Sequence, residues 1–297
     1  MISVNEIKSV NENVAVNGKT KVFAVLGDPI EQSLSPIMYN AAFTALGMDC
    51  IYIALKVEKS QLAEAVQGLK ALGIQGGNVT MPLKKEIIPY LDELTKEARL
   101  IGAVNTFYWE KGRLWGDNTD SSGFLSTLVE IKPDILKLKG ALLLGAGGAA
   151  RAIGVALALA GMKNFTIVNR TREKAKELAS LLESLGAITS VREWHMGGLK
   201  EAFYENKLLI NTTPIGMFTQ EKESLPIEEK WFNKGQFVVD LVYKPRETVF
   251  LQKAKARGCQ TYNGLPMLLA QGMLAFEKWS GQKAPTEIMA KELERWA

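Results

Sequence analysis

Short apolar runs alternate with helix-length amphipathic stretches over the first part of the chain. Residues 22–26, 51–57 and 74–79 are apolar and are bounded by glycine, proline or polar residues, which predicts buried strands. Ser35 and Ser60 are each expected to cap a helix between these strands. Strands that alternate with helices indicate an α/β fold with a mainly parallel sheet.

Further along, the pattern predicts a helix, a pair of strands and a second helix. Residues 89–100 are expected to be helical because Leu91, Leu94 and Ala98 fall on one face. Strands are expected at 103–108 and 112–116, and a helix from Asp120 to about residue 130.

A new strand–helix alternation begins near residue 138. Its predicted elements are a strand at 141–144, a helix to Ala160, a strand at 164–168, a charged helix from Arg172, strands at 208–210 and 237–241, a helix at 249–257, and helices after Gly264 and from Thr286. We therefore expect a first α/β domain at residues 1–119 and a nucleotide-binding domain of Rossmann type at 120–263. Residues 264–297 are helical and are expected to return to the first domain.

Composition limits the classes of protein that this pattern can represent. The chain has 297 residues, of which 47% are hydrophobic, and its 36 Lys and Arg against 32 Asp and Glu give a formal charge of +4. The positive charges are spread out, so neither a nucleic-acid partner nor a membrane partner is expected. No stretch is typical of a membrane span, and the polar N-terminal lead-in is not typical of a secretory signal.

The scarcity of histidine and cysteine excludes several kinds of site. His195 is the single histidine and is expected in a loop, so a multi-histidine metal site is excluded. Cys50 and Cys259 are far apart in the sequence, which argues against a disulfide scaffold and for a reducing cytoplasm. No metal is expected.

A glycine-rich turn links the predicted strand 141–144 to the following helix. Residues 145–150, GAGGAA, match the G-x-G-x-x-G/A pattern of dinucleotide-binding loops. Gly145 would permit the tight turn, Gly147 would let a pyrophosphate approach the backbone, and Ala150 would allow close packing of helix on sheet. The N–H groups and dipole of the helix N-terminus favour the phosphate charge.

The residues after the next predicted strand, 164–168, help to distinguish NADP from NAD as the cofactor. Residues 164–168 lead into Asn169 and Arg170, and no acidic residue occupies the strand tip. Arg170 and Lys174 are therefore expected to bind a 2′-phosphate, which favours NADP over NAD. Glu173 in the same segment is the feature that fits NADP least well.

The first domain contains polar residues in otherwise apolar surroundings, several of them after predicted strands. Open α/β sheets place ligands at that position, and hydroxyl and amide groups suit a small polyhydroxylated acid. The candidates are Ser33, Ser35, Asn78, Thr80, Lys84, Asn105, Thr106 and Asp120. Each of them taken alone could equally be a cap or turn residue.

Lys84 and Asp120 are the candidates for acid–base chemistry. Reduction of a carbonyl needs a proton donor for the alkoxide that forms, and with one histidine in the chain a lysine is the natural choice. An adjacent carboxylate would hold the ammonium in place. Spacing alone does not bring the two residues together.

Nine blocks of sequence, taken in order, resemble the shikimate dehydrogenase family from about Val22 to Trp279. They are SLSP, NVTMPLK, GAVNT, GDNTD, GAGGAAR, NRT, NTTPIGM, DLVYKP and GLPMLLAQG. The resemblance implies two α/β domains with the active site in the cleft between them. It also implies reversible reduction of 3-dehydroshikimate to shikimate with NADPH, on the route to chorismate and aromatic amino acids.

The resemblance assigns roles to residues of this chain. Lys84 and Asp120 would be the acid–base pair, and Ser33 and Ser35 would hold the substrate carboxylate. The remaining substrate contacts would be Asn78, Thr80, Asn105, Tyr243 and Gln271. The cofactor contacts would be Gly145, Ala146, Gly147, Gly148 and Ala149 at the pyrophosphate, Asn169, Arg170, Thr171 and Lys174 around the 2′-phosphate, and Leu241 and Gly264 near the nicotinamide.

Two other functions stay open on the sequence. One is a quinate/shikimate dehydrogenase that uses NAD, against which the basic NRTREK segment argues. The other is a cofactor-binding homologue without catalysis, against which the presence of Lys84 and Asp120 argues. A monomer and a homodimer are both compatible with the sequence.

Overall fold

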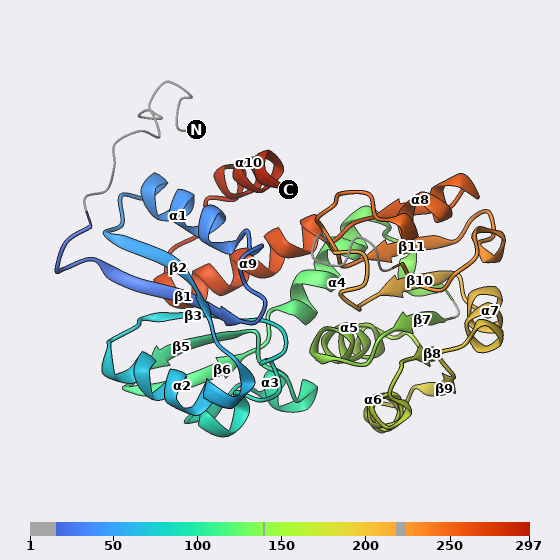
Figure 1. Cartoon of the computed structure of the whole chain (residues 1–297), viewed down its shortest axis with the longest axis horizontal. Helices are drawn as coiled ribbons and strands as arrows, with labels where there is room; N and C mark the ends of the chain where they lie inside the picture. The colour runs from blue at the N-terminus through green and yellow to red at the C-terminus, as the bar shows by residue number, and fades with distance from the viewer. Residues whose placement is uncertain (1–15, 139, 218–223) are drawn as a thin grey trace. The chain divides into compact units, whose positions relative to one another are not determined.

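The computed structural model describes residues 16–138, 140–217 and 224–297, and the chain forms two compact units. The first unit comprises the described residues up to Arg99, together with Val104–Asp117 and Gly272–Trp296. The second comprises Leu100–Ala103, Asn118–Gln271 and the terminal Ala297. Both have the predicted α/β architecture (Figure 1). The N-terminal lead-in up to residue 15 lies outside the described residues.

A six-stranded sheet in the order β2-β1-β3-β5-β6-β4 forms the centre of the first unit. β1 pairs in parallel with both β2 and β3, whereas β5 runs antiparallel to β3 and β6. The strands predicted at residues 22–26, 51–57 and 74–79 are confirmed as β1, β2 and β3. The bounds are β1 (Lys21–Gly27), β2 (Cys50–Lys56), β3 (Gly76–Val79), β4 (Glu93–Leu94), β5 (Thr106–Glu110) and β6 (Arg113–Asp117).

Helices cover both faces of this sheet. On one face Ala24 and Leu26 of β1 pack with Leu62 and Val66 of α2 (Leu62–Ala71). On the other face an aromatic cluster joins β1 and β2 to α1 (Ser35–Ala45) and the second half of α9 (Leu265–Ser280). Its members are Phe23, Tyr39, Phe43, Tyr52, Phe276 and Trp279. α10 (Thr286–Trp296) lies beside α1, so the C-terminal helices return to the first unit as expected (Figure 1).

The prediction of one helix over residues 89–100 is wrong. The segment forms a 3₁₀ turn at Ile88–Tyr90, the short strand β4 and the helix α3 (Lys96–Ile101). The cause is pairing with β6: the N–H of Asp92 donates to the carbonyl of Leu114, and the Asp92 carboxylate accepts from the N–H of Leu114 at 2.7 Å. Tertiary pairing therefore outweighs the local helical period.

Both serine caps predicted for this unit are also wrong. Ser35 is the first residue of α1 and Leu34 precedes it at the cap position, with no side-chain hydrogen bond. Ser60 lies inside a 3₁₀ turn at Lys59–Gln61, so that α2 begins only at Leu62. In both places the backbone makes a turn that the pattern of polar residues does not reveal.

The second unit is built on a fully parallel six-stranded sheet in the order β12-β11-β10-β7-β8-β9. Counted from β7, this is the doubly wound order of Rossmann folds. The bounds are β7 (Ala141–Leu144), β8 (Asn164–Val168), β9 (Ile188–Arg192), β10 (Leu208–Asn211), β11 (Phe237–Asp240) and β12 (Gln260–Tyr262). The sequence pattern did not predict β9 or β12.

Alternate residues of each strand supply two separate cores. Ala141 and Leu143 face one core together with α4, α5 and α6, while Leu142 and Leu144 face the other with α7 and α8. This arrangement follows from the two-residue period of a strand. The helices are α4 (Asp120–Ile131), α5 (Gly148–Leu159), α6 (Arg172–Ser184), α7 (Met196–Glu205) and α8 (Val249–Ala256), and 3₁₀ turns lie at Ile135–Lys137 and Glu229–Trp231. α7 was not predicted, and His195 caps it by accepting from the N–H groups of Gly197 and Gly198.

Candidate functional site

The glycine loop begins where β7 meets the sheet edge. Gly145 has a φ of +110°, and a Cβ at this position would lie 2.5 Å from Thr212 Oγ1. Its N–H donates to the carbonyl of Val168 at 2.8 Å, which continues the pairing of β7 with β8. The tight turn predicted at this position is confirmed, and both the φ and the lack of room favour glycine.

Gly147 and the start of α5 form an open backbone cradle. Gly147 is exposed, and a Cβ built on it would meet no atom of the described residues within 4 Å. Before Gly147, Ala146 is buried. After it, Gly148 and Ala149 begin the helix and are half-buried, and Ala150 is completely buried against the core. The N-terminus of a twelve-residue helix thus opens toward space, and this cradle fits a dinucleotide pyrophosphate.

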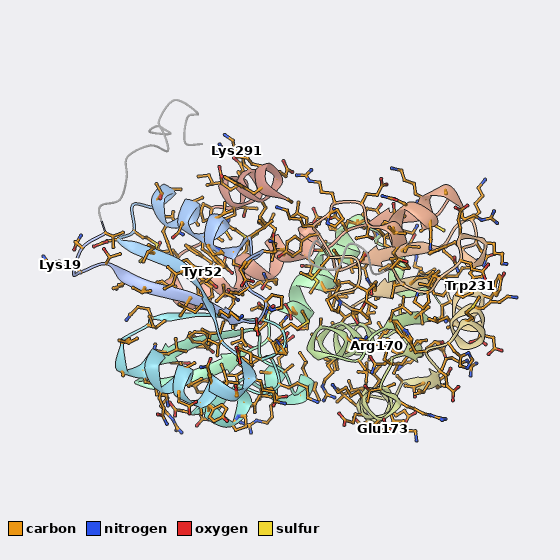
Figure 2. All side chains as sticks on the ribbon, in the orientation of Figure 1. Lys19, Tyr52, Arg170, Glu173, Trp231 and Lys291 are labelled. Atoms are coloured by element: carbon orange, nitrogen blue, oxygen red, sulfur yellow. The ribbon has the colours of Figure 1, made fainter. Side chains whose placement is uncertain are left out.

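The tip of β8 carries the residues expected around a 2′-phosphate. Asn169 follows the strand, and its side-chain amide donates to the carbonyl of Thr171 at 2.8 Å, which shapes the turn into α6. Arg170 and Lys174 are exposed. Glu173 is also exposed, in the first turn of α6 (Figure 2). Two cations available at a strand tip suit a phosphate.

Leu241 and Gly264 lie in backbone contact just after the ends of β11 and β12, on the side of the sheet away from β8 and β9. The N–H of Gly264 donates to the carbonyl of Val242 at 3.2 Å, and a Cβ on Gly264 would lie 2.0 Å from the Leu241 carbonyl oxygen. Leu241, Gly264 and Met267 also line an apolar cavity of about 20 Å³ between α4, β11 and α9. The structure therefore brings together two residues that are remote in the sequence.

Asn78 is held from two sides within the first unit. Its Oδ1 accepts from the hydroxyl of Tyr52 at 2.7 Å, and its Nδ2 donates to the carbonyl of Asn105 at 3.1 Å. All three residues are buried (Tyr52 is labelled in Figure 2). A side-chain amide has two N–H groups and two lone pairs on its oxygen, so one of each stays available to a ligand.

The other candidates of the first unit come from the ends of β1, β3 and neighbouring turns. The N–H of Ser35 donates to Ser33 Oγ at 3.3 Å, which places the two serines together. The N–H of Thr80 donates to the carbonyl of Leu26 at 2.8 Å, and the carbonyl of Lys84 accepts from the N–H of Val104 at 2.7 Å. The Lys84 backbone is thus tied to the segment that leads through Asn105 into β5.

Asp120, Tyr243 and Gln271 belong to the second unit. Asp120 is buried at the first position of α4, and its N–H donates to Asn118 Oδ1 at 3.1 Å. Gln271 is buried on α9, where its Nε2 donates to the carbonyl of Leu268 at 2.8 Å. Tyr243 is half-buried after β11. The two acid–base candidates, Lys84 and Asp120, thus lie in different units.

Two groups of residues that support the site were not among the sequence candidates. Tyr52 fixes Asn78, and Asp240 forms a buried network with Asn211 and Thr248 at the ends of β10 and β11. Burial raises the pKa of Asp240 to about 7, although its hydrogen bonds lower that pKa. The blocks NTTPIGM and DLVYKP contain Asn211 and Asp240, so a polar residue directly after an apolar strand was the available signal.

The doubly wound parallel sheet and the open glycine cradle define a protein of the dinucleotide-binding class, joined to a second α/β unit rich in polar side chains. Among the described residues, no helix has the length and apolar character needed to cross a bilayer.

Comparison with known proteins narrows this class. Family models match residues 25–107 (shikimate dehydrogenase substrate binding domain), 127–254 (shikimate/quinate 5-dehydrogenase) and 264–294 (shikimate 5′-dehydrogenase C-terminal domain). The shikimate dehydrogenase (NADP(+)) of Moorella thermoacetica is 46% identical over 94% of this chain and 95% of its own length. The chain belongs to the shikimate dehydrogenase family.

Solved structures agree with this assignment. Shikimate 5-dehydrogenase of Listeria monocytogenes, in complex with shikimate and NAD, has a TM-score of 0.83 and 37% identity, covering 94% of this chain and 98% of that one. Shikimate 5-dehydrogenase of Thermus thermophilus, in complex with NADP(H) and shikimate, has a TM-score of 0.80 and 38% identity, covering 93% of this chain and 100% of that one.

Proposed function

We propose that this protein catalyses the reversible NADPH-dependent reduction of 3-dehydroshikimate to shikimate, a step of chorismate and aromatic amino acid biosynthesis. The observation that carries the proposal is the open backbone cradle at Gly147, in a chain whose family acts on shikimate. Substrate binding is assigned mainly to the first unit and cofactor binding to the second. When bound, NADPH supplies the hydride.

In this proposal the cofactor is held by backbone and cations. The residues 145–149 bind the pyrophosphate through N–H groups at the start of α5. Arg170 and Lys174 bind the 2′-phosphate, with Asn169 and Thr171 shaping the turn between them. Leu241 and Gly264 lie against the nicotinamide. The exposure of Arg170 and Lys174 at the β8 tip supports a preference for NADP.

The substrate is held by side chains. Ser33 accepts from the Ser35 N–H and keeps its own O–H as a donor, so the two serines suit the substrate carboxylate. Asn78, which is fixed by Tyr52, binds a ring hydroxyl. Thr80, Asn105, Tyr243 and Gln271 complete the contacts. Every substrate oxygen needs such a partner because water is excluded when the ligands bind.

Lys84 and Asp120 carry the proton chemistry. Lys84 stabilises the negative charge that develops on the carbonyl oxygen and donates a proton to it, and Asp120 orients the ammonium. In the reverse direction Lys84 accepts the proton from the shikimate hydroxyl. The role of Asp120 is supported by its fixed position at the first turn of α4, where the Asn118 side chain holds its backbone.

Steady-state kinetics with two cofactors and two substrates test the proposal. Oxidation should be measured with NADP and with NAD, against shikimate and against quinate. We expect the highest kcat/KM with NADP and shikimate. A higher value with NAD and quinate would instead identify an NAD-dependent quinate/shikimate dehydrogenase, and the absence of turnover in all four assays would indicate a non-catalytic cofactor-binding protein.

The compartment and the assembly state are part of the same proposal. Cys50 and Cys259 are free thiols, which supports the proposed reducing, cytoplasmic location. We propose that the protein acts as a monomer or a homodimer on a small-molecule substrate, and light scattering at assay concentration distinguishes the two states.

A further inference from the structure

A carboxylate with no charged partner among the described residues is buried at the C-terminal end of β11. Asp240 has no exposed surface. Its Oδ1 accepts from Asn211 Nδ2 at 2.9 Å and from the N–H of Val242 at 3.0 Å, and its Oδ2 accepts from Thr248 Oγ1 at 2.6 Å. Burying a carboxyl group in this way is costly, and such groups cluster at functional sites.

The three donors come from three different parts of the second unit. Asn211 ends β10 and also accepts from the N–H and hydroxyl of Thr213. Val242 lies in the segment that follows β11, and Thr248 caps α8 by accepting from the N–H of Leu251 at 3.3 Å. One carboxylate therefore joins the end of β10 to both ends of segment 241–248.

We propose that Asp240 is a positioning residue, whose buried carboxylate fixes segment 241–248 and thereby sets Leu241 and Tyr243 against the bound ligands. The inference rests on the proposed function, because that function assigns the ligand contacts to Leu241 and Tyr243. Asp240 itself is completely buried and acts through its three hydrogen bonds.

The ionised form of Asp240 is the form that the surrounding donors fit. Burial raises the pKa of Asp240 from its ordinary 3.8 to about 7, while the hydrogen bonds from Thr248, Val242 and Asn211 lower it. Burial and these three hydrogen bonds are the causes of the shift. The described titratable groups on the elements around Asp240 are Tyr243, Lys244, Arg246 and Glu247 in segment 241–248, Lys253 and Lys255 on α8, and Tyr262 on β12, while β10 carries none.

Protonation of Asp240 would rearrange these hydrogen bonds. A carboxyl oxygen that carries a proton becomes a donor, so the Thr248 hydroxyl would have to turn and accept from it with its second lone pair, beside the bond that it accepts from Leu251. Segment 241–248 should stay closed but hold Leu241 and Tyr243 in a changed position. Because the pKa of Asp240 is near 7, kcat/KM should fall as the pH is lowered through about 7. We call this part of the pH profile the acidic limb.

Thr248 offers a matched pair of variants for the pH profile of kcat/KM. Thr248→Val removes the hydroxyl that favours the ionised Asp240, so the acidic limb should move to higher pH by about one unit, the equivalent of one hydrogen bond to a charged group. Thr248→Ser keeps the hydroxyl and should leave the limb in place. If the acidic limb has the same pH midpoint in Thr248→Val, Thr248→Ser and wild type, the inference is overturned.

Asp240→Asn tests the carboxylate directly. The variant should lower kcat/KM about tenfold above pH 8 and should lack the limb near pH 7, because an amide does not ionise. Asp134→Asn removes an exposed carboxylate elsewhere in the second unit and is the control expected to match wild type. If Asp240→Asn does not fold, the pH profiles of Thr248→Val and Thr248→Ser test the inference instead.

Hydrogen exchange of the protein without ligands gives a readout that is independent of activity. Because the pKa of Asp240 is raised in the closed protein, opening of the segment is favoured when the carboxylate is ionised. After correction for intrinsic rates, amides of 241–248 should therefore exchange faster at pH 8 than at pH 6 in wild type, and equally fast at both in Asp240→Asn. Protection that is independent of pH in wild type contradicts the inference. An inactive wild type with pH-dependent protection would instead reject only the proposed function.

Discussion

The two units form their candidate sites from different chemical groups. In the second unit the cradle at Gly147 consists of backbone, and its essential property is that no side chain of the described residues fills it. In the first unit Asn78 is a side chain held by Tyr52 and by the carbonyl of Asn105. A backbone site recognises a phosphate charge common to many ligands, whereas a fixed amide recognises one arrangement of hydroxyls. We therefore expect specificity for the substrate to depend on fixed side chains such as Asn78 more than on the backbone cradle.

Removal of the Lys84 amine should have the largest effect on catalysis. Lys84→Ala should lower kcat by about two to four orders of magnitude, as expected when a general acid is lost, and should change KM much less. The adjacent, exposed Lys85 provides the control, since Lys85→Ala removes a similar charge. Stopped-flow and steady-state rates measure both. If Lys84→Ala retains most of its kcat, Lys84 has no part in the chemistry.

Two alanine substitutions in the glycine loop should separate folding from cofactor binding. Gly147→Ala should leave the melting temperature unchanged and weaken NADPH binding about 10- to 100-fold, because the methyl group occupies the cradle. Gly145→Ala should cost about 1–3 kcal/mol of unfolding free energy from its positive φ, besides its approach to Thr212. Calorimetry and NADPH fluorescence titration measure the two effects. Equal stabilities for the two variants would refute the distinction.

Loss of the Arg170 charge should change the choice of cofactor. Arg170→Ala should lower the ratio of kcat/KM for NADP over NAD about tenfold, because one charge-assisted contact to the 2′-phosphate disappears. Lys176→Ala, which removes an exposed charge farther along α6, should leave this ratio unchanged. A similar fall in both variants would mean that general charge on α6, and not Arg170, selects NADP.

The smallest expected effect comes from the hydroxyl that supports Asn78. Tyr52→Phe should raise KM for shikimate about three- to tenfold and lower the unfolding free energy by about 1 kcal/mol, because a buried acceptor loses its donor. KM for NADP should not change. Tyr90→Phe, at an exposed position, is the control. An unchanged KM for shikimate would show that Asn78 needs no support from Tyr52.

The loop and strand proposed to bind the dinucleotide could be predicted because their signals are local. The apolar run 141–144, the glycines and the following helix are adjacent in the sequence, and the structure reproduces them as β7, the turn at Gly145 and α5. By contrast, residues 89–100 have a helical period, yet the helix begins only at Lys96, because Glu93 and Leu94 pair with β6 as the strand β4. A pairing partner some twenty residues away cannot be inferred from the period of one segment.

The sequence by itself determined the α/β class, the doubly wound dinucleotide unit and most of the candidate residues, because strand and helix periods and glycine turns depend on neighbours in the chain. Only the tertiary structure decided that Tyr52 fixes Asn78, that Gly264 lies on Leu241, and that Asp240 joins the ends of two strands and a helix. These contacts link residues remote in the sequence, so no local period or turn signal predicts them, and the buried polar groups among them need partners that only the folded chain provides.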